Sequence, residues 1–107
     1  ERALAMLRPF LATLAVLTLG ACGPMQSTSY LLDAQVSLEA AKVAQADKLA
    51  PYEWTAANLY IHKAREEVGY SDYEQAIAYA QTAAKFAAQA REHAIKAARR
   101  EEPLSAP

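Results

Sequence analysis

The sequence has little of most residue types that would indicate a specific chemistry. A single cysteine among 107 residues excludes a disulfide framework. The chain has 11 basic and 12 acidic side chains, and its net charge of −1 leaves no basic surplus for the phosphates of a nucleic acid. Only 3 glycines and 5 prolines interrupt a chain that is 53% hydrophobic and rich in alanine, a strong helix former. These features predict an all-α protein that does not bind nucleic acids.

The sequence also lacks a recognisable set of catalytic or metal-binding residues. His62 and His93 do not form a His-x-x-x-His pair, and neither has cysteine or clustered carboxylates at ligand spacing. Glu66 and Glu67 are adjacent on an expected helix, so their side chains diverge. We find no Gly-rich phosphate loop and no nucleophile elbow. We therefore expect a protein that is not an enzyme, with no catalytic residue, no metal and no cofactor.

An apolar segment precedes the part of the chain that is expected to fold. From Met6 to Cys22 the sequence has one positive residue, Arg8, followed by an uncharged apolar run and small residues. This order is typical of a secretory signal, and the run is shorter than the roughly 20 apolar residues of a spanning helix. We expect a signal peptide over residues 1–21, with Met6 as the initiator, and no later segment able to cross a bilayer.

The end of this segment resembles the lipobox of bacterial lipoproteins, in which an aliphatic residue and two small residues precede a cysteine. The matching residues are Leu19, Gly20, Ala21 and Cys22. The resemblance implies cleavage after Ala21, thioether attachment of diacylglycerol to Cys22 and acylation of the new amine. Only a thiolate is nucleophilic enough to take the lipid. The alternatives are an ordinary cleavable signal with a chance cysteine, or a buried free cysteine.

The two residues after Cys22 indicate in which membrane the lipoprotein is anchored. Gly23 and Pro24 stand where enteric bacteria place the Asp that retains a lipoprotein in the inner membrane. The resemblance therefore implies the outer membrane of a Gram-negative cell, with the protein facing the periplasm, and the inner membrane is the alternative. Residues 22–29 combine turn formers with small polar residues, which predicts a short lipidated tether.

Helix breakers divide the remaining chain into three expected helices, at residues 29–48, 51–68 and 72–100. They form a helical domain over residues 30–100, and residues 101–107 are expected to be a disordered tail. Pro51 suits the first turn of the second helix, although a single kinked helix over the first two segments is an alternative.

Each expected helix has an apolar stripe at steps of three and four residues. In the first helix, which places Asp33 in its first turn, the stripe is Leu32, Val36, Ala40, Val43, Ala46 and Ala50. In the second it is Trp54, Ala57, Ile61, Ala64 and Val68. In the third it is Tyr73, Ala76, Ala80, Ala83, Ala87, Ala90, Ala94 and Ala97. The alanines allow close approach of neighbouring helices, while the first two helices supply the bulk, and the end of the third, around Arg91 to Arg100, overhangs.

The connection between the second and third helices is the best-specified local feature. Gly69 is expected to take the left-handed conformation that closes a helix. The sequence Ser71-Asp72-Tyr73-Glu74 predicts a capping box in which the Ser71 hydroxyl accepts from the Glu74 amide. Because the connection is short, the two helices should be antiparallel neighbours. The expected architecture is a small antiparallel helical hairpin or three-helix bundle with an alanine-rich seam, after a lipoprotein signal peptide.

Six tyrosines are unusual in so small a domain. One interpretation is that they fill gaps left by an alanine-rich core and keep their hydroxyls at the surface. The alternative is a protein-docking patch, because exposed aromatic side chains are favoured at interfaces. Its expected members are Tyr52, Tyr60, Tyr70 and Tyr79.

Several segments together resemble a known family. Ala50-Pro51, the helix end at residues 64–69, the turn at residues 71–76 and the alanine row are similar to the short helical domain of unknown function 4398. That domain occurs in small bacterial lipoproteins and beside OmpA-type peptidoglycan-binding domains. The resemblance covers about residues 30–98 and implies a fold and a compartment but no chemistry. Residues 72–77 also resemble the second helix of a tetratricopeptide repeat, although no 34-residue recurrence is present.

These observations predict a lipid-anchored envelope protein that acts as a non-catalytic helical interaction or scaffold module. Its expected partners are the membrane, through the lipid, and an envelope protein or peptidoglycan-associated partner, with a homo-oligomer as a further option. The alternative is a structural lipoprotein similar to the murein lipoprotein, or a tetratricopeptide-like adaptor. The breaks at Pro51 and Gly69 argue against one long rod, and Ser105-Ala106-Pro107 argues against a terminal lysine linkage to peptidoglycan.

Overall fold

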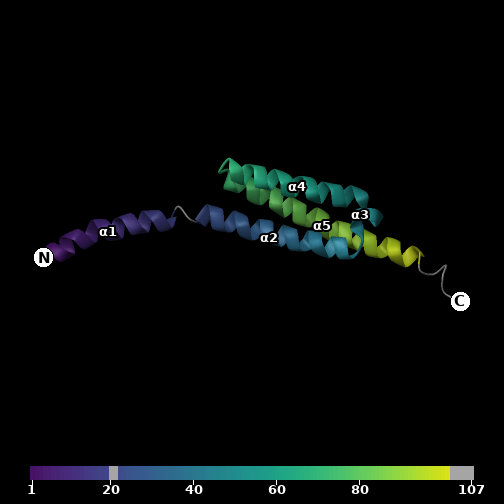
Figure 1. Ribbon diagram of the computed structural model, residues 1–107, viewed down its shortest axis with the longest axis horizontal. Coiled ribbons are helices and arrows are strands. Elements are labelled where there is room, and N and C mark those ends of the chain that lie inside the picture. The colour runs from purple at the N-terminus through teal and green to yellow at the C-terminus, as the bar shows by residue number, and fades with distance from the viewer. Residues whose placement is uncertain (20–21, 102–107) are drawn as a thin grey trace.

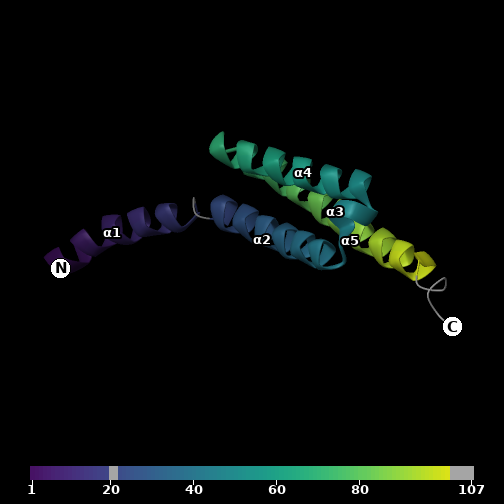
Figure 2. The ribbon, with the colours of Figure 1, turned by 45° about the vertical axis from the view of Figure 1, so that its right-hand side comes forward.

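The computed structural model describes residues 1–19 and 22–101, and in this part of the chain helices are joined by short turns. The helices are α1 (Arg2–Leu19), α2 (Cys22–Val43), α3 (Ala46–Leu49), α4 (Pro51–Gly69) and α5 (Tyr73–Glu101). Figure 1 and Figure 2 show α2, α4 and α5 packed side by side, with α1 outside this bundle. The predicted all-α class is confirmed.

Of the three long helices of the bundle, α2 and α5 run parallel, and α4 runs antiparallel to both. Ala34 of α2 and Ala83 of α5 share one core cluster, and Ala41 and Ala90 share the next, so α2 and α5 are parallel. Helix α4 runs antiparallel to α5, as the short connection at residues 70–72 predicted. The alternative of one kinked helix over the first two segments is wrong, because the chain reverses between α2 and α4.

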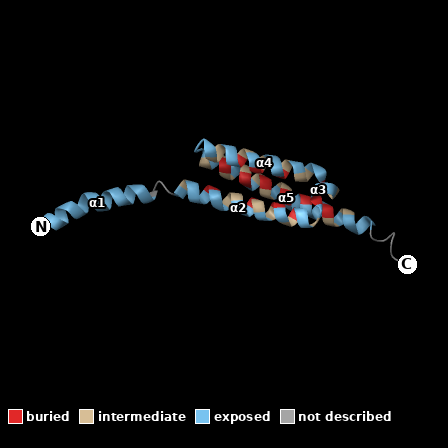
Figure 3. Cartoon of the chain, in the orientation of Figure 1, coloured by how far each residue is buried: buried red, intermediate tan, exposed pale blue. Residues whose placement is uncertain are grey.

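Helix α5 presents a continuous row of alanines to its neighbours, and Figure 3 shows it as part of the buried stripe. Six of the predicted seam residues are 0% exposed: Ala76, Ala80, Ala83, Ala87, Ala90 and Ala94. Among the described residues, Ser27 is the largest side chain that is less than 2% exposed. The predicted seam is confirmed, and the core is built mainly from small side chains that permit close helix approach.

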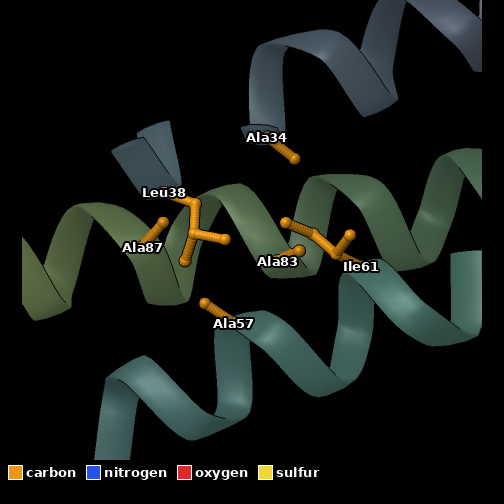
Figure 4. Close-up of a cluster of buried hydrophobic side chains, with 6 residues drawn as sticks. All are labelled: Ala34, Leu38, Ala57, Ile61, Ala83 and Ala87. Carbon is orange, nitrogen blue, oxygen red and sulfur yellow. The ribbon is translucent and has the colours of Figure 1, made fainter. Parts of the chain in front are cut away.

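Two clusters of buried side chains form this core. The first contains Ala34, Leu38, Ala57, Ile61, Ala83 and Ala87. Figure 4 shows that its large members, Leu38 and Ile61, point in among the alanines. The second contains Ala41, Ala46, Ala50, Ala90 and Ala94, and the partly buried Trp54 packs against both clusters. The predicted stripe of α4 is therefore confirmed at its centre.

The stripe predicted for the first helix is wrong in its larger members. Leu32, Val36 and Val43 are 60%, 68% and 86% exposed, whereas Leu38 is only 7% exposed. Two stripes with steps of three and four residues exist on this helix, and their spacing does not distinguish them. Size does, because branched side chains facing the alanine row would hold the helices apart. Helix α2 therefore turns its alanines inward and most of its larger apolar side chains outward.

The beginning of α2 also differs from the prediction. The residues expected to form a tether are helical, since α2 starts at Cys22. Pro24 lies in the first turn, where the missing amide hydrogen costs no helical hydrogen bond. The Ser27 hydroxyl donates to the Pro24 carbonyl over 3.0 Å, which satisfies this buried group. Asp33 consequently lies well inside the helix and not in its first turn.

Helix α2 ends at Val43, five residues before the predicted end. Gln45 has φ 62° and ψ 34°, the left-handed conformation, and the short helix α3 follows it. This turn rotates the chain so that Ala46 and Ala50 are buried although Val43 is exposed. Helix α4 then begins at Pro51, as predicted, with the proline in its first turn.

In the α4–α5 turn, the left-handed residue that ends α4 is not the predicted one. Gly69 is the last residue of α4 and has no positive φ, whereas Ser71 has φ 60°. The Asp72 amide donates to the Glu67 carbonyl over 2.9 Å and the Ser71 amide to the Val68 carbonyl over 3.0 Å. This pair of bonds is a Schellman motif with a serine in the left-handed position.

Asp72 caps α5 in place of the predicted Ser71. The Gln75 amide donates to Asp72 Oδ1 over 3.1 Å. Ser71 cannot take this role because its backbone is already the left-handed residue of the preceding helix end. The predicted turn is thus correct in position and in the antiparallel pairing of the helices, but the roles of its residues are shifted along the chain.

The part of α5 that extends beyond the bundle is shorter than predicted and begins closer to the C-terminal end of the helix. Ala94 is 0% exposed and packs in the second cluster, so the bundle still covers the helix beyond Arg91. Residues 98–101 are exposed. Glu101 is helical, and the rest of the predicted tail, residues 102–107, lies outside the described residues.

Candidate functional site

The predicted lipidation residue stands at the first position of α2. The Cys22 thiol is free and exposed. Leu19 is the last residue of α1, and Gly20 and Ala21 lie outside the described residues. An exposed thiol at the start of the bundle is accessible to a modifying enzyme, whereas a buried one would not be, so the alternative of a buried free cysteine is wrong.

The N-terminal region contains a helical stretch that is long and apolar enough to cross a membrane. Between Arg2 and Val43, an 18-residue window has a mean hydropathy of 1.7, and none of that window is buried in the bundle. This finding applies to a stretch that begins at Arg2, which is longer than the run between Arg8 and Cys22 considered above. A signal sequence near the N-terminus has the same length and composition, so the expected signal peptide stays a prediction.

Three of the four predicted docking tyrosines lie together along the α4 and α5 helices. The Tyr60 ring is 5.8 Å from the Tyr79 ring and stacks on Phe86 at 5.7 Å, with an interplanar angle of 8°. The Tyr52 ring meets the Phe86 ring edge-on at 6.4 Å. The ammonium of Lys63 lies 5.7 Å from the centre of the Tyr79 ring, within cation–π range. We call Tyr52, Tyr60, Tyr79 and Phe86 the aromatic row.

Beside the aromatic row lies a shallow groove of about 590 Å³ at the start of α4. It is lined by Pro51, Tyr52, Thr55, Ala56, Leu59, Tyr60 and Phe86. Tyr52 is 74% exposed and Leu59 is 51% exposed, so part of this wall is apolar surface in contact with water. Tyr60, Tyr79 and Phe86 are half-buried, which agrees with the gap-filling interpretation for those three rings.

Tyr70 does not join the aromatic row. It lies in the α4–α5 turn, while Tyr52 lies in the first turn of α4, so nearly the whole helix separates them. Phe86, which the sequence analysis did not select, is the ring that links Tyr52 to Tyr60. Its spacing of seven residues from Tyr79 placed both rings on one face of α5, and this signal could have found it.

A second apolar surface runs along the outer face of α2. Its members are Met25, Leu32, Val36 and Val43, which are 74%, 60%, 68% and 86% exposed. Their separations of seven, four and seven residues keep them on one side of the helix. Met25 and Leu32 also line a shallow depression of about 450 Å³ at the start of α2. We call these four residues the outer α2 stripe.

The polar side chains of the described residues do not converge on a reaction centre. His93 Nδ1 is 2.5 Å from Glu53 Oε1, and this pair of an exposed histidine and a half-buried glutamate ties α5 to the start of α4. His62 is exposed on α4, separate from this pair. Over residues 1–19 and 22–101, no group of three or more His, Cys, Asp or Glu side chains is arranged to hold a metal ion.

One charged pair on α5 changes the pKa of its carboxyl group. Lys96 Nζ donates to Glu92 Oε1 over 2.8 Å, one helical turn away. This hydrogen bond, and the positive charge behind it, lower the pKa of the Glu92 carboxyl. Both side chains are exposed, so the pair belongs to the solvated face of α5.

The comparisons with known proteins place the folded part of the chain in a family. No curated protein and no solved structure matches the sequence. Residues 29–106, which include the aromatic row and most of α2 and all of α4 and α5, match the family described as Domain of unknown function (DUF4398). The match covers well over half of the 107 residues and agrees with the resemblance inferred from the helix ends and the alanine row. The chain is a member of the DUF4398 family.

Proposed function

We propose that the protein is a lipid-anchored envelope protein that acts as a non-catalytic helical interaction module. The lipobox-like segment before Cys22 and the exposure of its thiol at the start of α2 support the anchor. Two or three acyl chains, with about 0.8 kcal/mol for each buried CH₂ group, give a durable attachment. Gly23 and Pro24 favour the outer membrane, with the bundle in the periplasm.

The observation that best supports an interaction role is the orientation of α2. A helix that packs only on its own bundle turns its large apolar side chains inward. Helix α2 instead buries Ala34 and Ala41, both 0% exposed, and leaves the outer α2 stripe in water. Contiguous exposed apolar side chains of this kind mark protein interaction sites more often than isolated ones do. We expect a partner helix to cover this stripe in the cell.

Crosslinking in living cells tests the proposal. A photoreactive amino acid replaces Val36 in the outer α2 stripe or, as the matched control, Glu92 on the solvated face of α5. We expect a crosslinked envelope protein from position 36 and much less product from position 92. Equal products from both positions, or no product from position 36, would contradict the docking role of the outer α2 stripe.

The anchor is tested separately. We expect wild-type protein to incorporate radiolabelled palmitate and to sediment with outer-membrane fragments on a density gradient. Cys22→Ser removes the thiol that forms the thioether while keeping a similar size, so the label should be lost. Labelling of the Cys22→Ser variant at the wild-type level would contradict the lipid attachment, and labelled protein in the inner-membrane fraction would contradict the location.

A second candidate function is a structural lipoprotein that associates with copies of itself. The heptad spacing of the outer α2 stripe favours this alternative, because identical helices pack through such seams. The same crosslinking experiment distinguishes the two candidates. A product from position 36 at twice the mass of the protein, containing only this chain, supports self-association, while a product containing a second protein supports the interaction module.

A further inference from the structure

The anchored end of the bundle can be identified from packing at the start of α2. A Cβ atom placed on Gly23 would lie 3.0 Å from Cδ2 of Tyr73, the first residue of α5. Gly23 therefore packs on the first residue of α5, directly after the α4–α5 turn, and Cys22 is its neighbour in the chain. Figure 1 and Figure 2 both show the start of α2 and this turn at one end of the bundle, with α3 toward the other end.

Two tyrosines mark the two ends of α4. Tyr70 follows the last residue of α4 at the anchored end, and Tyr52 lies in the first turn of α4, toward the other end. At about 1.5 Å per residue, the 18 positions between them correspond to roughly 27 Å. Both side chains are 74% exposed, so they differ in position along the bundle but not in their access to solvent.

We infer that the α4–α5 turn faces the lipid surface and that the Tyr70 ring lies in the headgroup region, while Tyr52 stays in water. This inference rests on the proposed membrane attachment before α2. Attachment by an acylated Cys22 and attachment by an uncleaved α1 both place the same end of the bundle at the membrane. A tyrosine has an apolar ring and a polar hydroxyl, the combination that is enriched at membrane–water interfaces.

The charges around the turn indicate which lipid surface fits. Glu66, Asp72 and Glu74 are exposed near Tyr70 and outnumber the one exposed cation of the last two turns of α4, Arg65, whereas Arg99 and Arg100 are exposed with Glu101 at the far end of α5. Acidic side chains within a Debye length of about 10 Å are repelled by anionic headgroups. The turn therefore fits a surface of zwitterionic headgroups, whose outermost groups are cationic, better than an anionic one.

Fluorescence quenching from within the bilayer tests this arrangement. The single native tryptophan is first removed by Trp54→Phe, and then either Tyr70→Trp or Tyr52→Trp introduces one reporter at an equally exposed site. Each full-length variant is purified from membranes and reconstituted in phosphatidylcholine vesicles whose acyl chains carry bromine close to the headgroup. Mass spectrometry records whether Cys22 carries lipid, and circular dichroism compares helix content with wild type.

We expect the brominated lipid to reduce Tyr70→Trp fluorescence at least about twofold and to leave Tyr52→Trp fluorescence nearly unchanged. Replacing part of the phosphatidylcholine by phosphatidylglycerol at low salt should weaken the quenching at position 70. Equal quenching at both positions, or no quenching at position 70, would overturn the inference, and stronger quenching on anionic vesicles would overturn its headgroup preference. Lipid on Cys22 with an unquenched position 70 refutes this inference alone, whereas quenching without lipid refutes the acyl anchor and supports the orientation.

Discussion

Helices α2 and α5 lie parallel and in contact, but they divide their apolar side chains in opposite ways. Helix α5 buries a row of six alanines, while its larger apolar side chains are only partly buried and most of its exposed positions are charged or polar. Helix α2 has two apolar rows, of which the one with more small side chains is buried. The comparison indicates that side-chain volume, and not hydrophobicity alone, decides which face of a helix packs against an alanine seam.

The largest expected effect separates the two rows of α2. Leu38→Ala removes a side chain that is 7% exposed, and the cavity left behind should lower the free energy of unfolding by about 2 to 5 kcal/mol. Leu32→Ala, the same change at a residue that is 60% exposed, should cost less than about 0.5 kcal/mol. Denaturant unfolding followed by Trp54 fluorescence measures both values. Similar losses for the two variants would show that the outer row also packs in the isolated chain.

The alanine row of α5 gives the next largest effect. Ala87→Leu inserts a larger side chain at a position that is 0% exposed in the first cluster, so we expect a loss of about 1 to 3 kcal/mol in spite of the good helix propensity of leucine. The adjacent Ala88 is exposed, and Ala88→Leu should stay within about 0.5 kcal/mol of wild type. Equal tolerance at both positions would contradict close packing along the seam.

Much of this comparison could be predicted from the sequence, and the remainder could not for identifiable reasons. The row from Ala76 to Ala94 was predictable because it is an unbroken run of alanines at steps of three and four residues. The packing face of α2 was not, because the stripe through Leu32 and the stripe through Leu38 have equal spacing, and only the volume available beside α5 distinguishes them. The shape of the partner surface is a property of the folded bundle.

The same reasoning applies to the candidate surfaces. Tyr52, Tyr60 and Tyr79 were identified by residue type, and two of them are joined by Phe86. Tyr70 was grouped with them because the sequence does not show that it lies at the opposite end of α4. The turn residues Gly69 and Ser71 were assigned from residue preference, but the Schellman hydrogen bonds place the left-handed residue two positions after Gly69.

The α4–α5 turn gives a smaller pair of effects with opposite signs. Asp72→Ala removes the side chain that accepts from the Gln75 amide, and we expect a loss of about 1 kcal/mol. Ser71→Gly relieves the left-handed backbone at φ 60° and should raise the free energy of unfolding by about 0.5 to 1 kcal/mol. Thermal unfolding of both variants beside wild type measures the two shifts. A loss from Ser71→Gly would return the capping role to the Ser71 hydroxyl.

The smallest expected effect concerns the outer face of α5, which is polar where the outer face of α2 is apolar. Lys96 lowers the pKa of Glu92 in the folded chain through a hydrogen bond and its positive charge. A carboxyl whose pKa is lowered by folding stabilises the fold above its unfolded pKa, and this contribution is lost as the pH falls through the folded pKa. Both side chains are exposed and screened by salt, so acidification should shift the melting temperature little through this pair.

Lys96→Ala should raise the pKa of Glu92 toward its ordinary value, which an NMR titration of the carboxyl carbon measures. In wild type, 1 M salt should shift the Glu92 pKa in the same direction. A Glu92 pKa that stays unchanged in Lys96→Ala would mean that this pair does not form in solution.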